Sequence, residues 1–164
     1  MTYLITFACY GCHLHGHASG SVDRQHNLPG SPLMEADQQR ASRELQRMEQ
    51  ARYRMDTKRR VVVLAALHER CQQRHWSLLA AHVRTNHVHL VVAGEVRPER
   101  IMNDVKACAS RCLNRQGWDG PTRKRWARHG STRWLWQPAH VAAAIRYVVD
   151  GQGEPMAVFQ ALEG

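Results

Sequence analysis

One strand organises this chain, and its sequence is Arg84-Thr85-Asn86-His87-Val88-His89-Leu90-Val91-Val92. Because side chains alternate between the two faces of a β-strand, His87 and His89 lie on the same face. The other face carries Val88, Leu90 and Val92, which predicts that it joins a core. Two neutral imidazoles side by side can hold a metal ion if other elements complete the site. In a chain with eleven histidines, such a pair can also be only a half-exposed polar face.

Three further segments are expected to form a sheet with this strand. Residues 76–84 are a second β-rich run, and Thr85-Asn86 predicts a hairpin between the two runs, because asparagine tolerates the positive φ of a tight turn. Residues 3–10 alternate and are rich in β-branched and aromatic residues, which predicts a first strand. A short strand is expected at residues 133–137.

Two helices are expected between these strands. Asp56 and Thr57 can cap a helix that runs to about residue 74. Pro98 is a favourable first residue for the next helix, which stops before Gly117. Helical periodicity predicts the inward-facing residues as Val61, Leu64, Ala65, His68 and Cys71 in the first helix, and as Ile101, Val105, Cys108 and Cys112 in the second.

A third helix is predicted for residues 138–150, with Gly151 as its natural stop. Its buried stripe, at 100° per residue, is Val141, Ile145 and Val148. Tyr147 lies off this stripe, so its hydroxyl can face whatever the helix crosses. The sequence therefore predicts an α+β fold in a single domain, residues 1–164. This fold is a ferredoxin-like βαββαβ antiparallel sheet with an additional C-terminal helix that carries the tyrosine.

Composition favours nucleic acid as the partner. Lysine and arginine number 23 against 14 acidic residues, which gives a formal net charge of +9 and a pI near 10.0. Such an excess attracts a polyanion, although a basic protein can also simply be soluble. There is no apolar run of about 18 residues, and the N-terminus does not read as a signal peptide, so we expect a cytoplasmic protein without membrane contact.

The five cysteines fit a reducing compartment better than a disulfide framework, because their number is odd. Cys9, Cys12, Cys108 and Cys112 could be imagined as a four-thiolate zinc site. Cys108 and Cys112 fall on the apolar stripe of a predicted helix, however, which favours a place in the core.

Two irregular regions are expected outside the sheet and its helices. Residues 11–55 predict a long loop, in which His13, His15 and His17 could add a metal ligand or simply be solvated, followed by an exposed helix or insertion. Residues 118–133 predict a basic loop with interleaved tryptophans, typical of a surface that holds phosphates and stacks bases. The expected nucleic-acid contacts are Lys106, Arg111, Arg123, Lys124, Arg125, Trp126, Arg128 and Arg133.

The histidine stretch, followed some sixty residues later by a helical tyrosine, resembles the HUH single-tyrosine transposases of the small insertion-sequence and REP-associated kind. Further segments look like members of that family. These are Leu4-Ile5-Thr6-Phe7-Ala8-Cys9-Tyr10-Gly11, Ser21-Val22-Asp23-Arg24-Gln25-His26-Asn27, Asn103-Asp104-Val105-Lys106-Ala107 with Ser110-Arg111, and Arg146-Tyr147-Val148-Val149-Asp150-Gly151-Gln152-Gly153-Glu154-Pro155-Met156. The resemblance covers most of the chain apart from residues 34–55.

This resemblance implies a metal-dependent enzyme that cleaves and rejoins single-stranded or hairpin DNA. His87 and His89 would bind magnesium or manganese at a DNA phosphate. Tyr147 would attack the phosphorus and form a 5′-phosphotyrosyl link. Family members often place a glutamine ligand one helical turn after the tyrosine, where this chain has Gly151. We expect Gln152 to take that role, with Asp150 and His140 as alternatives.

Two other functions fit the same residues. A nucleic-acid-binding or regulatory protein could keep the fold and the basic loop without cleaving DNA. A histidine-dependent phosphohydrolase would cleave without a covalent adduct, but the chain lacks the further histidine repeat that such enzymes tend to use. The resemblance leaves open whether the chain acts as a monomer or as a homodimer that lends Tyr147 from one copy to the other.

Overall fold

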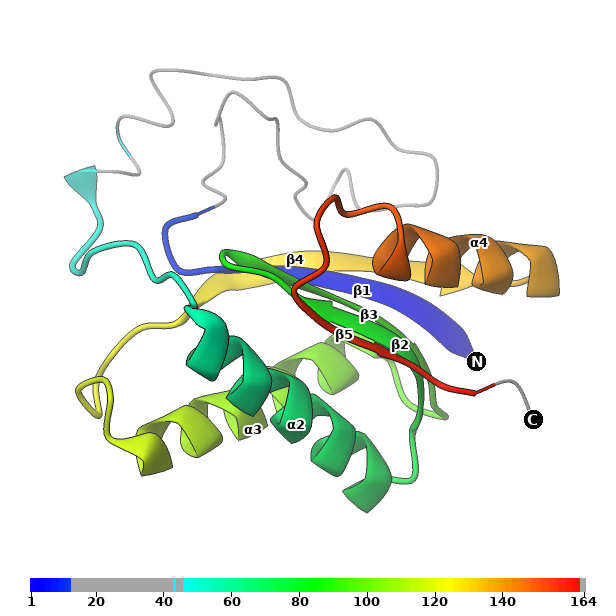
Figure 1. Cartoon of the computed structure of the whole chain (residues 1–164), viewed down its shortest axis with the longest axis horizontal. Coiled ribbons are helices and arrows are strands. Elements are labelled where there is room, and N and C mark those ends of the chain that lie inside the picture. The colour runs from blue at the N-terminus through cyan, green and yellow to red at the C-terminus, as the bar shows by residue number, and fades with distance from the viewer. Residues whose placement is uncertain (13–42, 44–45, 163–164) are drawn as a thin grey trace.

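The computed structural model describes residues 1–12, 43 and 46–162. Its elements along the chain are β1 (Thr2–Cys9), α2 (Thr57–Gln73), β2 (Ser77–Val83), β3 (His87–Ala93), α3 (Pro98–Gln116), β4 (Trp126–Leu135), α4 (Pro138–Val149) and β5 (Ala157–Gln160). The strands form one antiparallel sheet in the order β4-β1-β3-β2-β5. Helices α2 and α3 lie on one face of the sheet and α4 lies on the other (Figure 1). The predicted ferredoxin-like α+β fold is confirmed, and β5 is a strand that was not predicted.

The main core lies between the sheet and the helices α2 and α3. Alternate residues of β1 are buried there, and Val88, Leu90 and Val92 of β3 join them as predicted. Cys108 and Cys112 of α3 belong to the same core. Each fully buried aliphatic or phenylalanine side chain stabilises such a core by about 1.5–3 kcal/mol, so the alternation in β1 and β3 fixes which face of each strand looks inward.

Helix α2 begins where the sequence predicts, but it buries a different face. The Asp56 carboxylate accepts a hydrogen bond from the Arg59 backbone N–H, which caps the helix. Its buried residues are Val63, Ala66, Leu67 and Cys71. Val61, predicted to face inward, is 59% exposed. The apolar run from residue 61 to residue 67 offers more than one stripe at helical spacing, and packing against α3 and β2 selects between them.

The last residues of the segment 11–55, which was expected to end in an exposed helix or insertion, belong to the core. Tyr53 and Met55 are buried, and their backbone N–H groups donate to the carbonyls of Tyr10 and Thr85. The expectation of an exposed insertion is therefore wrong for these residues. The predicted loop with His13, His15 and His17 lies outside the described residues.

Two other elements depart from expectation. Strand β4 begins at Trp126 and pairs with β1, so much of the predicted basic loop is a strand. The hairpin between β2 and β3 closes through the Arg84 N–H, which donates to the His87 carbonyl. Asn86 has no positive φ, contrary to prediction.

Among the described residues, no helix combines the length and apolar character needed to cross a membrane.

Helix α4 packs on the opposite face of the sheet. Its predicted bounds are confirmed to within one residue, and Val148 is buried as expected. The small cluster beneath the helix contains Ala80 of β2, Val91 of β3 and Leu4 of β1. This packing holds α4 across the same sheet face that carries His87 and His89.

Candidate active site

The two histidines of β3 lie side by side on the face that α4 covers. Their ring centroids are 4.7 Å apart and the rings are nearly perpendicular, at 86°. His89 is 4% exposed and pairs in register with Thr6 of β1 and His82 of β2. His87 is half-buried, near the end of the strand. The strand period thus produces the predicted pair, with one ring deep and one ring closer to solvent.

His89 is held as a neutral imidazole with one nitrogen left over. Burial, and after it the neighbouring His87 ring, lowers the pKa of His89 to about 3. Its Nδ1 lies 2.8 Å from Thr6 Oγ1, while its Nε2 is buried without a hydrogen bond to any described residue. If Nδ1–H donates to the threonine, the lone pair is on Nε2. A buried acceptor without a partner is costly in a folded protein, and a bound cation would satisfy it.

The His87 ring is oriented by the residue before it. Its Nδ1 lies 2.6 Å from Asn86 Oδ1, and a carboxamide oxygen can only accept, so Nδ1 carries the proton. The lone pair of His87 is then on Nε2, as a metal ligand requires. Sequence reasoning gave Asn86 only a role in the turn. Its position directly before the first histidine was the signal that could have revealed this contact.

Tyr147 comes from α4 and lies over His89. The two ring centroids are 5.6 Å apart at 76°. All four tyrosines of the chain are described, and Tyr147 is the exposed one, at 48%. Tyr3 and Tyr53 are buried, and Tyr10 is half-buried with its hydroxyl accepting from the Glu49 N–H. The structure therefore brings one solvent-accessible phenol to the histidine pair of the same chain.

Gln152 lies at the edge of this group. Its Nε2 donates to the Tyr147 carbonyl at 3.0 Å. The Gln152 side chain also works against the lowering of the His89 pKa, so it lies near the His89 ring. His140 lies in the first turn of α4, away from Tyr147, and Asp150 is exposed at the C-cap. Of the three candidate third ligands, Gln152 is the one placed beside the pair.

A cation here would need an amide, phenol, phosphate or water oxygen besides the imidazoles. Within the described ranges, no three histidine, cysteine, aspartate or glutamate side chains gather around a possible ion. The imagined four-thiolate zinc site is therefore not formed.

His82 supports the site from the neighbouring strand, and sequence reasoning missed it. It is fully buried, and its Nδ1 lies 2.9 Å from the carbonyl of Val148, the residue after Tyr147. The Met156 N–H donates to its Nε2 at 3.1 Å. A carbonyl accepts and an N–H donates, so only the neutral Nδ1–H form of His82 makes both bonds. Burial lowers the pKa of His82, which agrees with that form.

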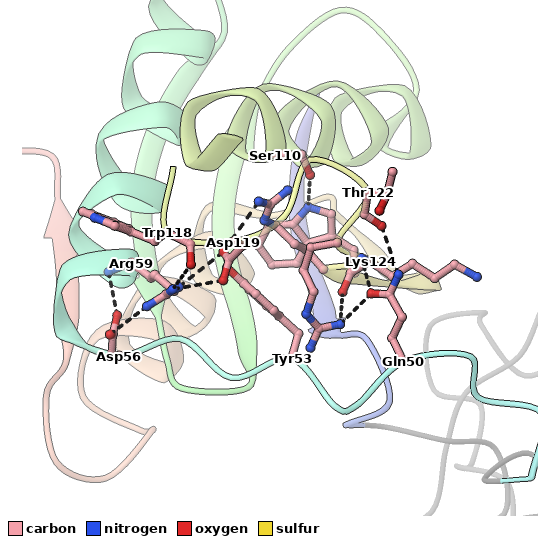
Figure 2. A network of polar contacts seen from close by, with 12 residues as sticks. Gln50, Tyr53, Asp56, Arg59, Ser110, Trp118, Asp119, Thr122 and Lys124 are labelled. Carbon is pink, nitrogen blue, oxygen red and sulfur yellow. Dashed lines mark hydrogen bonds and ion pairs between the residues drawn. The ribbon is translucent and has the colours of Figure 1, made fainter. Parts of the chain in front are cut away.

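The loop predicted to bind DNA is fastened to the rest of the protein. Asp119 forms an ion pair with Arg59 at 2.9 Å and accepts a hydrogen bond from the Tyr53 hydroxyl at 2.8 Å. Arg125 is 4% exposed, with its Nη2 at 3.5 Å from the same carboxylate. Figure 2 shows this network, which joins α2, the segment before it and the loop after α3.

Two other cations of the loop also point toward protein groups. Arg123 donates to the Gln50 side chain and to the Ala51 carbonyl. Lys124 pairs with Glu49 at the surface. Their positive charges are therefore partly used to hold residues 49–51 against the loop.

Lys106 and Trp126 are structural as well. The Lys106 ammonium donates to the carbonyls of Ala127 and His129 in β4, and burial lowers the pKa of Lys106 to about 8. The Trp126 indole N–H donates to Ser110 and to the Lys106 carbonyl. Lys106 and Arg125, two of the predicted DNA contacts, are both buried, and their contact with DNA stays a prediction. Exposed side chains in the predicted set are Arg111, Lys124, Arg128 and Arg133.

Comparisons with known proteins agree with this arrangement. A family model described as "Transposase IS200 like" matches residues 44–147, which include both histidines and end at the tyrosine. None of the curated proteins compared with the chain matches it.

Two solved structures resemble the chain. The structure of a REP-associated tyrosine transposase bound to a REP hairpin is 10% identical, with a TM-score of 0.50. That comparison covers 92% of this chain and 65% of the other, so the chain spans less than two thirds of that protein. A presumed transposase from Deinococcus radiodurans is 14% identical, with a TM-score of 0.43, over 93% of this chain and 90% of the other.

At 10% identity, the likeness to the hairpin-bound protein shows the fold alone. The family model, in contrast, matches more than half of the sequence and includes His87, His89 and Tyr147 of the candidate site. The chain belongs to the family of IS200-like transposases.

Proposed function

We propose that this protein cleaves and rejoins single-stranded DNA by transesterification, with Tyr147 as the nucleophile. The observation that carries the proposal is the exposed Tyr147 ring, 5.6 Å from the ring of a neutral, buried His89. A phenol is a weak nucleophile at neutral pH, so it needs a partner that makes the phosphorus more electrophilic. The histidine pair beside it is suited to hold such a partner.

The residues fit a divalent cation, magnesium or manganese. His87 and His89 would hold it, with Gln152 as the expected third ligand. The fit rests on the partnerless buried Nε2 of His89 and on Asn86, which keeps the proton of His87 on Nδ1. When bound, the cation would polarise the scissile phosphate and offset its developing negative charge.

The covalent step exchanges one phosphate ester for another. The Tyr147 hydroxyl gives its proton to solvent and its oxygen bonds to the 5′ phosphate. The bond from phosphorus to the 3′ oxygen breaks, and that oxygen takes up a proton. Attack by a 3′ hydroxyl of another strand reverses the step and releases the tyrosine. Bond energy is conserved, so rejoining needs no nucleotide cofactor.

Hairpin DNA is the proposed substrate class, because the REP-associated transposase of the same fold is bound to a REP hairpin. Tyr147 already contacts His89 within one chain. We therefore expect cleavage in cis, with no requirement for a tyrosine from a second copy.

The test is covalent capture of DNA. The protein is incubated with a labelled hairpin oligonucleotide carrying a single-stranded flank and with manganese, and a slowed band is sought on a denaturing gel. The wild type should form the adduct and Tyr147→Phe should form none. Tyr10→Phe is the matched control, because it removes a tyrosine hydroxyl away from the histidine pair and should keep the adduct.

Two outcomes contradict the proposal. Binding without an adduct at any manganese concentration would make the chain a DNA-binding protein without cleavage activity. Strand cleavage that persists in Tyr147→Phe would indicate hydrolysis by the histidine site.

A further inference from the structure

One large aromatic side chain stands in solvent at the junction of β4 and α4. All five tryptophans of the chain are described, and Trp136 is the exposed one, at 65%. Trp76 is buried, and the other three are half-buried. An exposed indole forgoes the free energy that burial would supply, so its position invites a functional explanation.

The exposed ring is held in place by two others. The Tyr3 ring is buried, with its hydroxyl donating to the Val96 carbonyl at 3.0 Å. Trp134 packs edge-on against Tyr3, with centroids 5.0 Å apart at 88°. Trp136 stacks nearly parallel on Trp134, with centroids 5.2 Å apart at 13°. One face of Trp136 is thus supported, and a flat ligand on the exposed ring would cost little ordering of the side chain.

The surroundings favour an anionic ligand. Between Arg125 and Asp150 the sequence has no acidic residue, and its three arginines, Arg128, Arg133 and Arg146, are all exposed. Arg133 pairs in register with Leu4 and so points to the α4 side of β4, whereas Trp134 points to the α3 side. Flat rings beside positive charge are the features that bind single-stranded nucleic acid, with rings stacking on bases and cations attracting phosphates.

The position of Trp136 relates it to the candidate active site. Strand β4 leads directly into α4 (Figure 1). Trp136 comes just before the helix and Tyr147 near its other end. Nine residues separate Pro138 from Tyr147, a rise of about 14 Å, or roughly four stacked nucleotides. Trp134 packs on Tyr3 in the core beneath α3, so the stacked pair lies on the α3 side of the edge strand β4. A strand whose phosphate reaches Tyr147 would pass around this edge to place a base on Trp136.

We propose that Trp136 is a stacking platform for an unpaired base of the DNA strand that Tyr147 attacks. The inference rests on the proposed function, which supplies the unpaired strand. It assigns a base-binding position that is separate from the histidine pair and from the loop at residues 118–125.

The test measures affinity without chemistry. In a Tyr147→Phe background, labelled oligonucleotides with a single-stranded flank are titrated by fluorescence anisotropy. Trp136→Ala should weaken binding by about 5- to 100-fold, the range found when an aromatic that stacks on a base is removed. Trp136→Phe should recover most of the affinity. Val61→Ala, which trims another exposed apolar side chain, on α2, should change nothing.

A second series identifies the base. Single abasic sites are placed along the flank, which removes one base at a time and keeps every phosphate. An abasic site at one position should lower the affinity of the wild type. The same abasic site should not change the affinity of Trp136→Ala, because this variant already lacks the ring on which the base stacks. Additive losses at every position would overturn the proposal, as would equal affinity of Trp136→Ala for intact DNA.

The two proposals fail separately. If the wild type forms no adduct but its DNA binding depends on Trp136, only the proposed transesterification is refuted. Normal adducts, together with binding that is indifferent to Trp136, would refute only the stacking platform. Sedimentation velocity completes the test, because a change of oligomeric state in Trp136→Ala would assign the ring to contact with a second copy and overturn the proposal.

Discussion

At the scale of single residues, the Nε2 atom of His89 links the stability of the protein to its proposed chemistry. A polar atom buried without a partner destabilises the fold by about 1–3 kcal/mol. We therefore expect His89→Leu to be more stable than the wild type by about 1 kcal/mol without metal, measured by urea unfolding. Manganese should stabilise the wild type and leave the variant unchanged. A wild type that gains no stability from manganese would contradict the proposed metal site.

His82 gives a second prediction, because its two hydrogen bonds to backbone groups hold different parts of the site. His82→Asn places an amide near Nδ1 and can keep the bond to the Val148 carbonyl, whereas His82→Gln can keep the bond from the Met156 N–H. His82→Leu loses both and should destabilise the protein by about 2 kcal/mol.

The adduct assay separates positioning from stability in these variants. If the Val148 bond positions Tyr147, His82→Asn should form the adduct faster than His82→Gln at saturating DNA. Equal rates in the two variants would reduce His82 to a purely structural role.

The histidine pair and Tyr147 could be found from the sequence because each lies in a strongly periodic segment. The strand period puts His87 and His89 on one face, and the helical period turns Tyr147 away from the buried stripe. His82 could not be found this way. Its role depends on a carbonyl and an N–H far along the chain, and no local pattern specifies that meeting.

At the scale of elements, the ends of helices were easier to predict than their faces. Asp56 caps α2, and Gly117 closes α3 with φ 71°, a left-handed conformation that suits glycine. These signals are local. The prediction of the buried face of α2 was wrong because the apolar run of this helix is compatible with several buried faces. Strand β5 was missed because a segment of four residues is too short to show a clear alternation of apolar and polar residues.

Lys106 shows how an element can bury a charge, and it predicts a pH dependence. Its pKa is lowered from 10.5 to about 8 in the folded protein. Between these values the unfolded chain holds the proton and the folded chain does not, so this group makes stability rise with pH. The rise is on the order of 3 kcal/mol and is complete above the unfolded pKa.

The comparison with Lys106→Met isolates this effect. The variant also loses the bonds to β4, which adds an offset that is independent of pH. Urea unfolding of both proteins from pH 7 to pH 10.5 should show the wild type gaining stability relative to the variant. A difference that stays constant over this range would mean that Lys106 keeps an ordinary pKa.

At the scale of the whole molecule, the network around Asp119 fastens the segment before α2 to the loop after α3. Asp119→Asn would leave Arg125 buried without its anionic partner, so we expect a loss of about 3 kcal/mol in the free energy of unfolding. Glu49→Gln removes an exposed partner of Lys124 and should cost little stability, because a solvated ion pair contributes little. The DNA affinity of the folded variants should equal that of the wild type. A marked loss of DNA affinity in folded Asp119→Asn would indicate that the loop contacts DNA.

Net charge predicted a nucleic-acid partner but did not locate the surface. A count of cations does not reveal which of them bind groups inside the protein. Here Lys106 donates to two carbonyls and Arg125 pairs with a carboxylate. Only the folded chain sorts them by face. Arg133 pairs in register with Leu4, which packs on the α4 side, whereas Arg111 belongs to α3 on the opposite side of the sheet.

This division by face predicts which exposed arginine contacts DNA. Each phosphate neutralised by the protein steepens the fall of log affinity with log salt by about 0.7 for single strands. Arg133→Gln should therefore reduce that slope by about 0.7 and weaken binding to all sequences similarly. Arg111→Gln removes the same charge from the far face and should leave the slope unchanged. Titrations from 50 to about 200 mM salt in the Tyr147→Phe background measure both slopes, since the salt effect is large over this range. The opposite ranking would place the DNA on the side of α2 and α3, away from Tyr147.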